Sequence, residues 1–113
     1  MKKIECILRP NKLKDVKDAL DNIGVTGMTV TEAIGFGKQK GHTDKEEWNA
    51  EFNITLLPKT KIEMVVTDEL VDEVINIIIK AAKTGEIGDG KIFTYPISNA
   101  IRIRTGEDGD KAL

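Results

Sequence analysis

The chain has 113 residues, of which 40% are apolar and 32% charged, and its formal net charge is −2. This length suits one domain with a single modest core. Because the chain as a whole is not basic, it has no positive field to attract nucleic acid or an anionic membrane. The first residues are polar and charged, and no stretch reaches about 18 consecutive apolar residues. We therefore expect a cytoplasmic protein that does not insert into membranes.

The first half of the chain predicts a strand, a helix and a second strand. Residues 3–8 alternate between apolar and polar, and the only cysteine, Cys6, lies on the apolar face, where we expect a buried core residue rather than a reactive thiol. Residues 12–23 have apolar positions at helical spacing, and Gly24 is a natural stop. Residues 28–36 are rich in β-branched side chains and predict the second strand.

A long polar segment separates the two halves of the chain. Residues 37–58 contain glycines and charges without periodicity, and a structureless stretch of this length in a compact domain is commonly functional. Residues 60–66 then alternate as a third strand.

The second half predicts a helix over residues 69–82, with Asp68 as its N-cap. Four isoleucines between positions 75 and 79 favour a strand locally, but length and the flanking charges favour the helix. A glycine-rich turn at 84–91 leads into a strand over 91–95. Residues 101–105 predict one more short strand, and the polar tail 106–113 is expected to fray until something orders it.

This order of elements predicts an α+β fold of the ferredoxin-like βαββαβ type, as one domain over residues 1–113. Its antiparallel sheet has helices on one face only, so the other face needs cover. Sheets packed around a threefold axis would supply that cover, and we expect a homotrimer.

Three segments have residues suited to phosphate. Gly35, Gly37 and the nearby lysines would let a backbone approach an anion, although an ordinary strand end explains them equally simply. Gly88 and Gly90 can form an anion-holding nest, or an ordinary turn, with Lys91 as counter-charge. In a strand, the side chains of Arg102 and Arg104 would point the same way, as a pair suited to polyphosphate or as a solvated basic edge.

Catalytic chemistry has little support in the sequence. Lys59 and Glu63 flank the return from the long loop, where Lys59 could hold a carboxylate or extend along the surface. His42 has no histidine or cysteine partner at metal-binding spacing, and a solvated loop histidine is the simpler interpretation. No Ser-His-Asp, Cys-His or paired-carboxylate arrangement stands out. We therefore expect a binding protein and not an enzyme.

Taken together, several segments resemble the PII family of nitrogen-regulatory signalling proteins, and the resemblance covers nearly the whole chain. They are GMTVTE at 27–32, GFGKQKGHT at 35–43, LPKTKIE at 57–63, TGEIGDGKIF at 84–93 and IRIRTGE at 101–107. The resemblance identifies 37–58 as the flexible T-loop, 84–91 as the B-loop and 101–113 as the C-terminal loop. It implies a homotrimer with ATP or ADP in clefts between subunits.

The resemblance also implies roles for individual residues. The phosphates would be lined by Gly35, Gly37, Lys38 and Gln39, by Gly88, Asp89, Gly90 and Lys91, and by Arg102 and Arg104 of a neighbouring subunit, with Thr29 near the adenine. Gln39 would contact Mg²⁺ and the effector 2-oxoglutarate, which requires Mg-ATP, and Lys59 would pair with the carboxylate of that effector. The T-loop would then regulate partners such as an ammonium transporter or nitrogen-assimilation enzymes.

The chain departs from the family pattern within the T-loop. Phe52 stands at the position of a tyrosine that many relatives uridylylate, and without a hydroxyl it cannot accept a nucleotide. Trp48 replaces an arginine that plugs ammonium channels, so it either anchors a different partner or packs within the loop. Lys38 replaces a common arginine and loses its planar fork. The alternatives are a divergent adenine-nucleotide sensor without a 2-oxoglutarate response, regulating a transporter or nitrogenase, or a weak ATPase.

Overall fold

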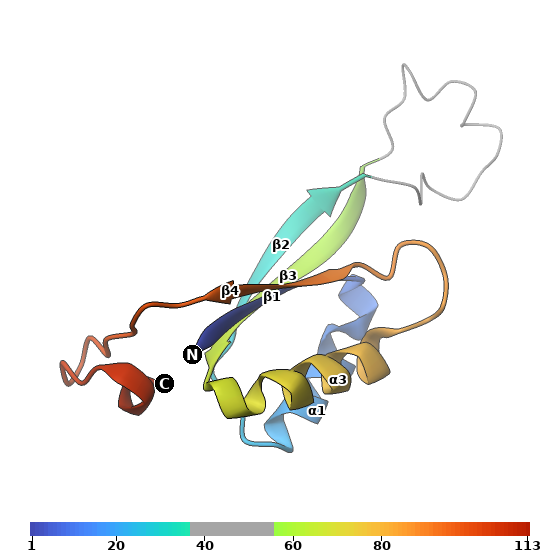
Figure 1. Cartoon of the computed structure of the whole chain (residues 1–113). Coiled ribbons are helices and arrows are strands. Elements are labelled where there is room, and N and C mark those ends of the chain that lie inside the picture. The colour runs from blue at the N-terminus through green and yellow to red at the C-terminus, as the bar shows by residue number, and fades with distance from the viewer. Residues whose placement is uncertain (37–55) are drawn as a thin grey trace, which may run out of the picture.

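The computed structural model describes residues 1–36 and 56–113. These residues form a four-stranded antiparallel sheet in the order β2-β3-β1-β4 (Figure 1). The strands are β1 (Lys2–Leu8), β2 (Thr29–Gly35), β3 (Leu57–Val66) and β4 (Lys91–Pro96). Two helices, α1 (Leu13–Asp21) and α3 (Val71–Ala82), complete the predicted ferredoxin-like α+β fold, which is thereby confirmed.

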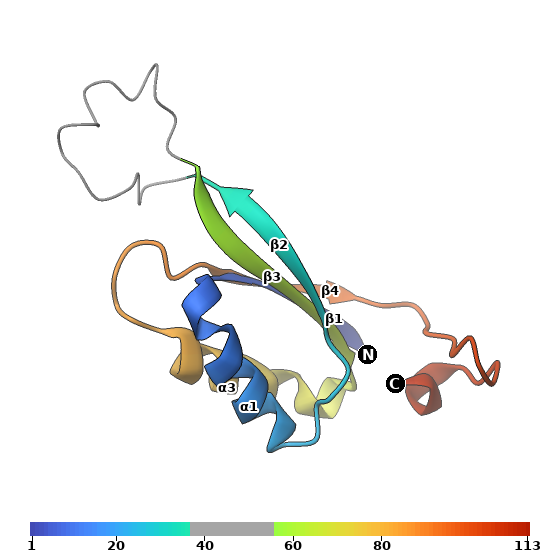
Figure 2. The same ribbon diagram turned by 180° about the vertical axis from the view of Figure 1, so that it is seen from behind.

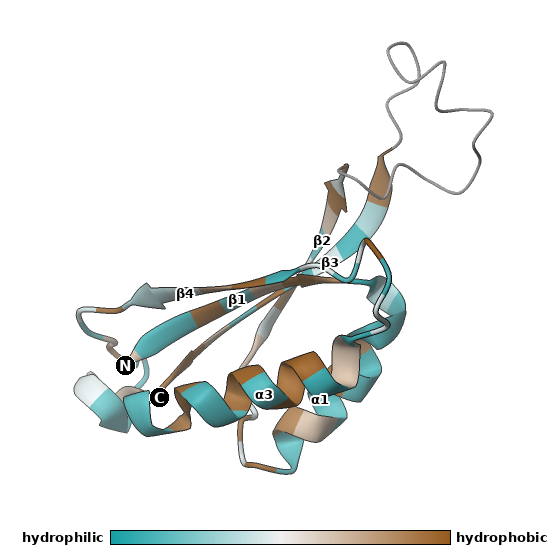
Figure 3. Ribbon diagram, turned by 45° about the vertical axis from the view of Figure 1, so that its right-hand side comes forward, coloured by the Kyte–Doolittle hydropathy of each residue, from teal (hydrophilic) through white to brown (hydrophobic). Residues whose placement is uncertain are grey.

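Both helices pack against the same face of the sheet, as the two opposite views show (Figures 1 and 2). Cys6 pairs with Ile62 of β3 on one side and with Ile92 of β4 on the other, so the apolar alternation of the three strands is in register. The same alternation of hydrophobic and hydrophilic residues is visible along the strands and α3 in Figure 3. The fully buried core side chains are Ile4, Leu8, Val16, Leu20, Ile62, Val74 and Ile78.

The predicted elements of the first 96 residues are confirmed with shifted boundaries. The third strand begins at Leu57 rather than at 60, so the last two residues of the predicted loop 37–58 belong to β3. The helix after β3 begins with a 3-10 turn, Asp68–Leu70, before α3. The prediction that Asp68 caps this helix is wrong. The Asp68 carboxylate instead forms an ion pair with the terminal amine of Met1 at 3.0 Å.

The C-terminal segment differs most from prediction. Residues 101–105 do not form a strand: Ile101 makes an isolated bridge to Asp108, with a turn between them. The tail is not frayed either, because it ends in a 3-10 helix, Gly109–Ala112. This segment is held largely by its own hydrogen bonds, including Gly109 N to Ala100 O, and it extends away from the sheet (Figure 1).

The face of the sheet opposite the helices carries a mixture of charged and apolar side chains. Lys3 forms an ion pair with Glu63 at 2.6 Å and lies over the ring of Tyr95 at 5.1 Å. The Tyr95 hydroxyl donates to Glu5 at 3.3 Å, and Phe93 of β4 is exposed. No element of the described residues covers this face, in agreement with the expectation of helices on one side only. Within residues 1–36 and 56–113, no helix is long and apolar enough to span a bilayer.

Candidate functional site

A cavity of about 630 Å³ lies where the ends of β1 and β2 meet the starts of β3 and β4. The turn that joins α3 to β4 forms one of its walls. Ile7, Leu57 and Phe93 supply apolar lining. Six of the residues predicted to bind ligand also line it: Gly35, Lys59, Gly88, Asp89, Gly90 and Lys91. Residues distant in sequence are therefore brought together at one cavity.

The turn owes its path to glycines with positive φ. Gly85, Gly88 and Gly90 have φ of 89°, 107° and 100°, values that side chains rarely tolerate. At Gly90 the backbone also approaches β1 closely, because an added Cβ would lie 1.7 Å from the carbonyl oxygen of Ile7. Only glycine fits at position 90, and the turn is thereby held against the end of β1.

Asp89 holds the turn from within. Its carboxylate accepts hydrogen bonds from the Thr84 hydroxyl, from the backbone amides of Thr84 and Gly85 at 2.9 Å each, and from Arg9 Nε at 3.2 Å. The Thr84 hydroxyl first, and then these amides and Arg9, hold the pKa of Asp89 well below its usual range. The side chain is therefore ionised and engaged with the protein, so any contact of this residue with a phosphate would fall to its backbone.

Arg9 is a site residue that the sequence analysis missed. It follows β1 directly, and its guanidinium donates to Asp89 at 3.2 Å and to the carbonyl oxygen of Ile87 at 3.0 Å. Its partners lie 78 and 80 residues further along the chain, so no local pattern indicates them. The close approach of Gly90 to β1 is what brings them within reach.

Lys59 enters the cavity from β3 and donates to the carbonyl oxygen of Gly88 at 2.9 Å. Burial first, and then the neighbouring charge of Arg9, lower the pKa of Lys59, while Asp89 opposes this effect. Two cations and one well-anchored carboxylate thus meet at this turn, and Lys91 begins the adjoining strand. Glu86 also lines the cavity, so the positive charges of Lys59, Lys91 and Arg9 exceed the negative charges of Asp89 and Glu86 by one, and this excess favours an anionic ligand.

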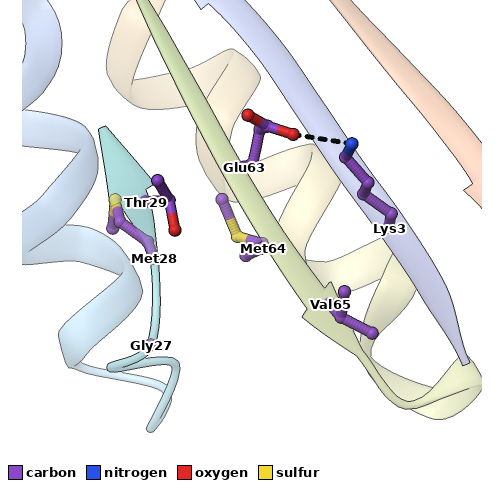
Figure 4. Close-up of a pocket in the computed structure, with 7 residues that line it drawn as sticks. All are labelled: Lys3, Gly27, Met28, Thr29, Glu63, Met64 and Val65. Atoms are coloured by element: carbon purple, nitrogen blue, oxygen red, sulfur yellow. Dashed lines mark ion pairs between the residues drawn. The ribbon is translucent and has the colours of Figure 1, made fainter. Parts of the chain in front are cut away.

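Thr29 and Glu63 lie at a different cavity, of about 590 Å³ (Figure 4). They face each other across β2 and β3, and Gly27, Met28 and Met64 contribute to the lining. The hydrogen bond from Lys3 is the main cause of the lowered pKa of Glu63. The structure therefore does not bring Glu63 and Lys59 into one cavity of a single chain.

Arg102 and Arg104 lie on the C-terminal segment rather than at either cavity. Because residues 103–105 form a turn, the prediction of two guanidinium groups side by side on a strand is wrong. Arg102 donates to the Glu107 carboxylate at 3.4 Å and to the carbonyl oxygen of Leu113 at 3.2 Å. Arg104 is exposed.

The remaining candidates lie outside the described residues: Gly37, Lys38, Gln39, His42, Trp48 and Phe52. Among residues 1–36 and 56–113, no group of three or more His, Cys, Asp or Glu side chains could hold a metal ion. The proposed metal contact, Gln39, belongs to the part that is not described.

Comparisons with known proteins agree with the sequence resemblance. The family model described as nitrogen regulatory protein P-II matches residues 1–107. Nitrogen regulatory protein P-II of Klebsiella oxytoca is 56% identical over 113 residues, which is all of both chains. The protein of the same name from Haemophilus influenzae is also 56% identical, and nitrogen regulatory protein P-II 1 of Escherichia coli K12 is 55% identical, again over the full length of both chains.

Proposed function

Because this chain belongs to the nitrogen regulatory protein P-II family, we propose that it reports nitrogen and energy status by binding ATP or ADP. With Mg-ATP it would also bind 2-oxoglutarate, and it would regulate partner proteins through the loop 37–58. The protein would act by contact with its partners and not as an enzyme.

The observation that carries the proposal is the cavity beside the turn 86–90. Gly35 presents backbone without a side chain, and Gly88 and Gly90 do the same on the facing wall. Backbone amides in glycine-rich turns, supplemented by lysine, are a recurrent way of holding phosphate oxygens. The apolar walls of the same cavity, Ile7 and Phe93, suit the less polar part of a nucleotide.

Assembly into a homotrimer would complete the site. In one chain, the candidates among residues 1–36 and 56–113 fall at the cavity beside the turn, at the cavity of Thr29 and on the C-terminal segment. A single nucleotide could use all three only if neighbouring subunits contribute some of them. The exposed Ile103, which is 99% accessible, and the uncovered face of the sheet also support packing against other copies.

Magnesium and 2-oxoglutarate fit the charges of the site. Mg²⁺ prefers oxygen ligands and commonly binds through substrate phosphates, so it needs few protein contacts; Gln39 would be one. When bound, it would neutralise phosphate charge and so make the site more favourable for the carboxylates of 2-oxoglutarate. Lys59, with its ammonium already in the cavity, would pair with a carboxylate of that effector.

The physical basis of signalling would be the reciprocal coupling of these ligands. If each ligand favours binding of the other, the coupling is typically about 1–3 kcal/mol. Each ligand can shift the loop 37–58 only by its different affinity for the loop's conformations. The partner would be a protein such as an ammonium transporter or a nitrogen-assimilation enzyme, and Phe52 excludes nucleotidylation at that position.

Calorimetry tests the proposal. The purified protein is titrated with ATP, with ADP, and with 2-oxoglutarate in the presence and absence of Mg-ATP, and its mass in solution is measured by light scattering. We expect a trimer that binds both nucleotides and takes up 2-oxoglutarate only with Mg-ATP. If 2-oxoglutarate gives no heat in any condition, the alternative of a divergent adenine-nucleotide sensor replaces the effector part. The proposal would be overturned if the trimer bound neither ATP nor ADP, or if the protein turned over ATP faster than about 1 s⁻¹.

A further inference from the structure

Arg9 contacts the turn 86–90 from outside the cavity. It does not line the cavity, yet its guanidinium holds two groups of the turn at once, the Asp89 carboxylate and the Ile87 carbonyl oxygen. Both charged side chains are partly buried, with 19% and 24% of their surfaces accessible. The planar fork of arginine suits two acceptors in fixed positions, which a single ammonium group does not match.

The carbonyl that Arg9 holds sets the direction of an amide. All described peptide bonds are trans, so the C=O of Ile87 and the N–H of Gly88, which share one planar unit, point in opposite directions. With the carbonyl directed to Arg9, the Gly88 N–H points away from Arg9. Within the described residues, this N–H has no hydrogen-bond acceptor.

We propose that Arg9 is a positioning residue for anion binding, which fixes the Ile87–Gly88 peptide so that the Gly88 amide is presented to a phosphate oxygen in the cavity. Asp89 is its necessary partner, because the carboxylate ties Arg9 to Thr84 and Gly85, which directly precede the turn. This inference rests on the proposed binding of nucleotides. It adds a role for Arg9, which lies outside the cavity and would act by orienting the Gly88 amide rather than by attracting the ligand with its charge.

Two substitutions separate geometry from charge. Arg9→Lys keeps the positive charge but loses the fork, and Asp89→Asn removes a negative charge beside the cavity. If only charge mattered, the first would bind ATP about as well as the unaltered protein, and the second would bind it more tightly. If the turn must be positioned, both weaken ATP binding.

The experiment measures ATP affinity of the full-length protein by calorimetry for the unaltered chain, Arg9→Lys, Arg9→Gln, Asp89→Asn and the Arg9→Gln/Asp89→Asn double variant. We expect each single variant to bind at least about tenfold more weakly, equivalent to about 1.4 kcal/mol. The double variant should bind no more weakly than the weaker single variant, because both substitutions release the same brace. Lys17→Gln is the matched control, since it breaks an exposed ion pair with Asp21 on α1, and it should change affinity less than twofold.

A second measurement needs no ligand. In the nitrogen-15 NMR spectrum of the ligand-free protein, the Gly88 amide should shift in Arg9→Lys, which is distant in sequence, and not in Lys17→Gln. Thermal unfolding confirms that each variant is folded, and if Arg9→Gln does not fold, Arg9→Lys and Asp89→Asn decide the question. Unchanged ATP affinity of Arg9→Lys, or tighter binding by Asp89→Asn, would overturn the positioning role alone. Failure of the unaltered protein to bind ATP would overturn the proposed function and this inference together.

Discussion

The ammonium group of Lys59 donates a hydrogen bond to the carbonyl oxygen of Gly88 at 2.9 Å, which joins β3 to the turn after α3. The same lysine lines the cavity and lies near Arg9, whose charge contributes to the lowered pKa of Lys59. A ligand carboxylate or phosphate beside Lys59 would therefore meet a cation that is already positioned. Occupation of this cavity and the conformation of the turn are thus connected through one side chain.

We expect Lys59→Ala and Arg102→Ala to lower the affinities for different ligands. Lys59→Ala should weaken 2-oxoglutarate binding by a larger factor than ATP binding, because it removes the cation proposed to pair with the effector's carboxylate. Arg102→Ala should chiefly weaken ATP. Calorimetry with each ligand measures both, and Lys14→Ala, at an exposed position on α1, is the control. Equal losses of both ligands in both variants would contradict this division of roles.

Gly90→Ala should strongly destabilise the protein. The new Cβ would lie 1.7 Å from the Ile7 carbonyl oxygen, and a φ of 100° is itself strained for alanine. We expect a loss of more than about 2 kcal/mol in the free energy of unfolding, measured in urea. Gly27→Ala is the matched control, because a Cβ there meets nothing within 4 Å and its φ is not positive. Similar losses in the two variants would show that the contact with Ile7 is not what matters.

Asp89 should give the protein an acid-sensitive contribution to stability. Its pKa in the folded protein lies below the ordinary 3.8 of the unfolded chain. The stabilisation is therefore complete above about pH 4 to 5 and declines as the pH falls through 3.8 toward the lower folded-state pKa. We expect the free energy of unfolding to fall more steeply between about pH 5 and about pH 3 in the unaltered protein than in Asp89→Asn.

Other carboxylates with lowered pKa values, such as Asp18 and Glu63, are present in both proteins and cancel in this comparison. Parallel pH profiles for the unaltered protein and Asp89→Asn would mean that the bonds from Thr84, Gly85 and Arg9 do not favour the ionised carboxylate.

The thiol of Cys6 should be unreactive in the folded protein. Burial raises its pKa to about 11 from an ordinary 9.0, which lowers the thiolate fraction at pH 8 by about 100-fold before any effect of access. Labelling by a chromogenic disulfide reagent should therefore be slow in buffer and rapid in denaturant, with Cys6→Ala as the blank. Rapid labelling of the folded protein would show that the helix-covered face of β1 opens readily.

The fold could be predicted from the sequence because its strands and helices have clear local patterns. The alternation of Ile4, Cys6 and Leu8 and the helical spacing around Val16 and Leu20 describe the two layers of one core. The prediction for the C-terminal segment was wrong. Ile101 and Ile103 suggest a strand, whereas the backbones of Arg102 and Gly106 form hydrogen bonds that close a turn.

The site could be predicted only where glycine or charge clusters mark it. Gly88 and Gly90 do adopt the positive φ that their turn needs, and Lys59 does reach it. Arg9 could not be found, since an arginine after a strand has no local feature that indicates partners 80 residues away. The prediction of Asp68 as an N-cap failed for a similar reason, because the Met1 amine that pairs with it is distant in the sequence.

The atoms nearest to a Cβ added at Gly90 belong to the main chain of Ile7 and Leu8, and Ile7 is also one of the apolar residues that line the cavity. Position 7 could therefore exchange one apolar side chain for another and reshape the pocket without disturbing how the turn is seated. Position 90 has no such freedom. If selection favoured a different ligand, position 7 could change while the contacting position 90 stayed glycine.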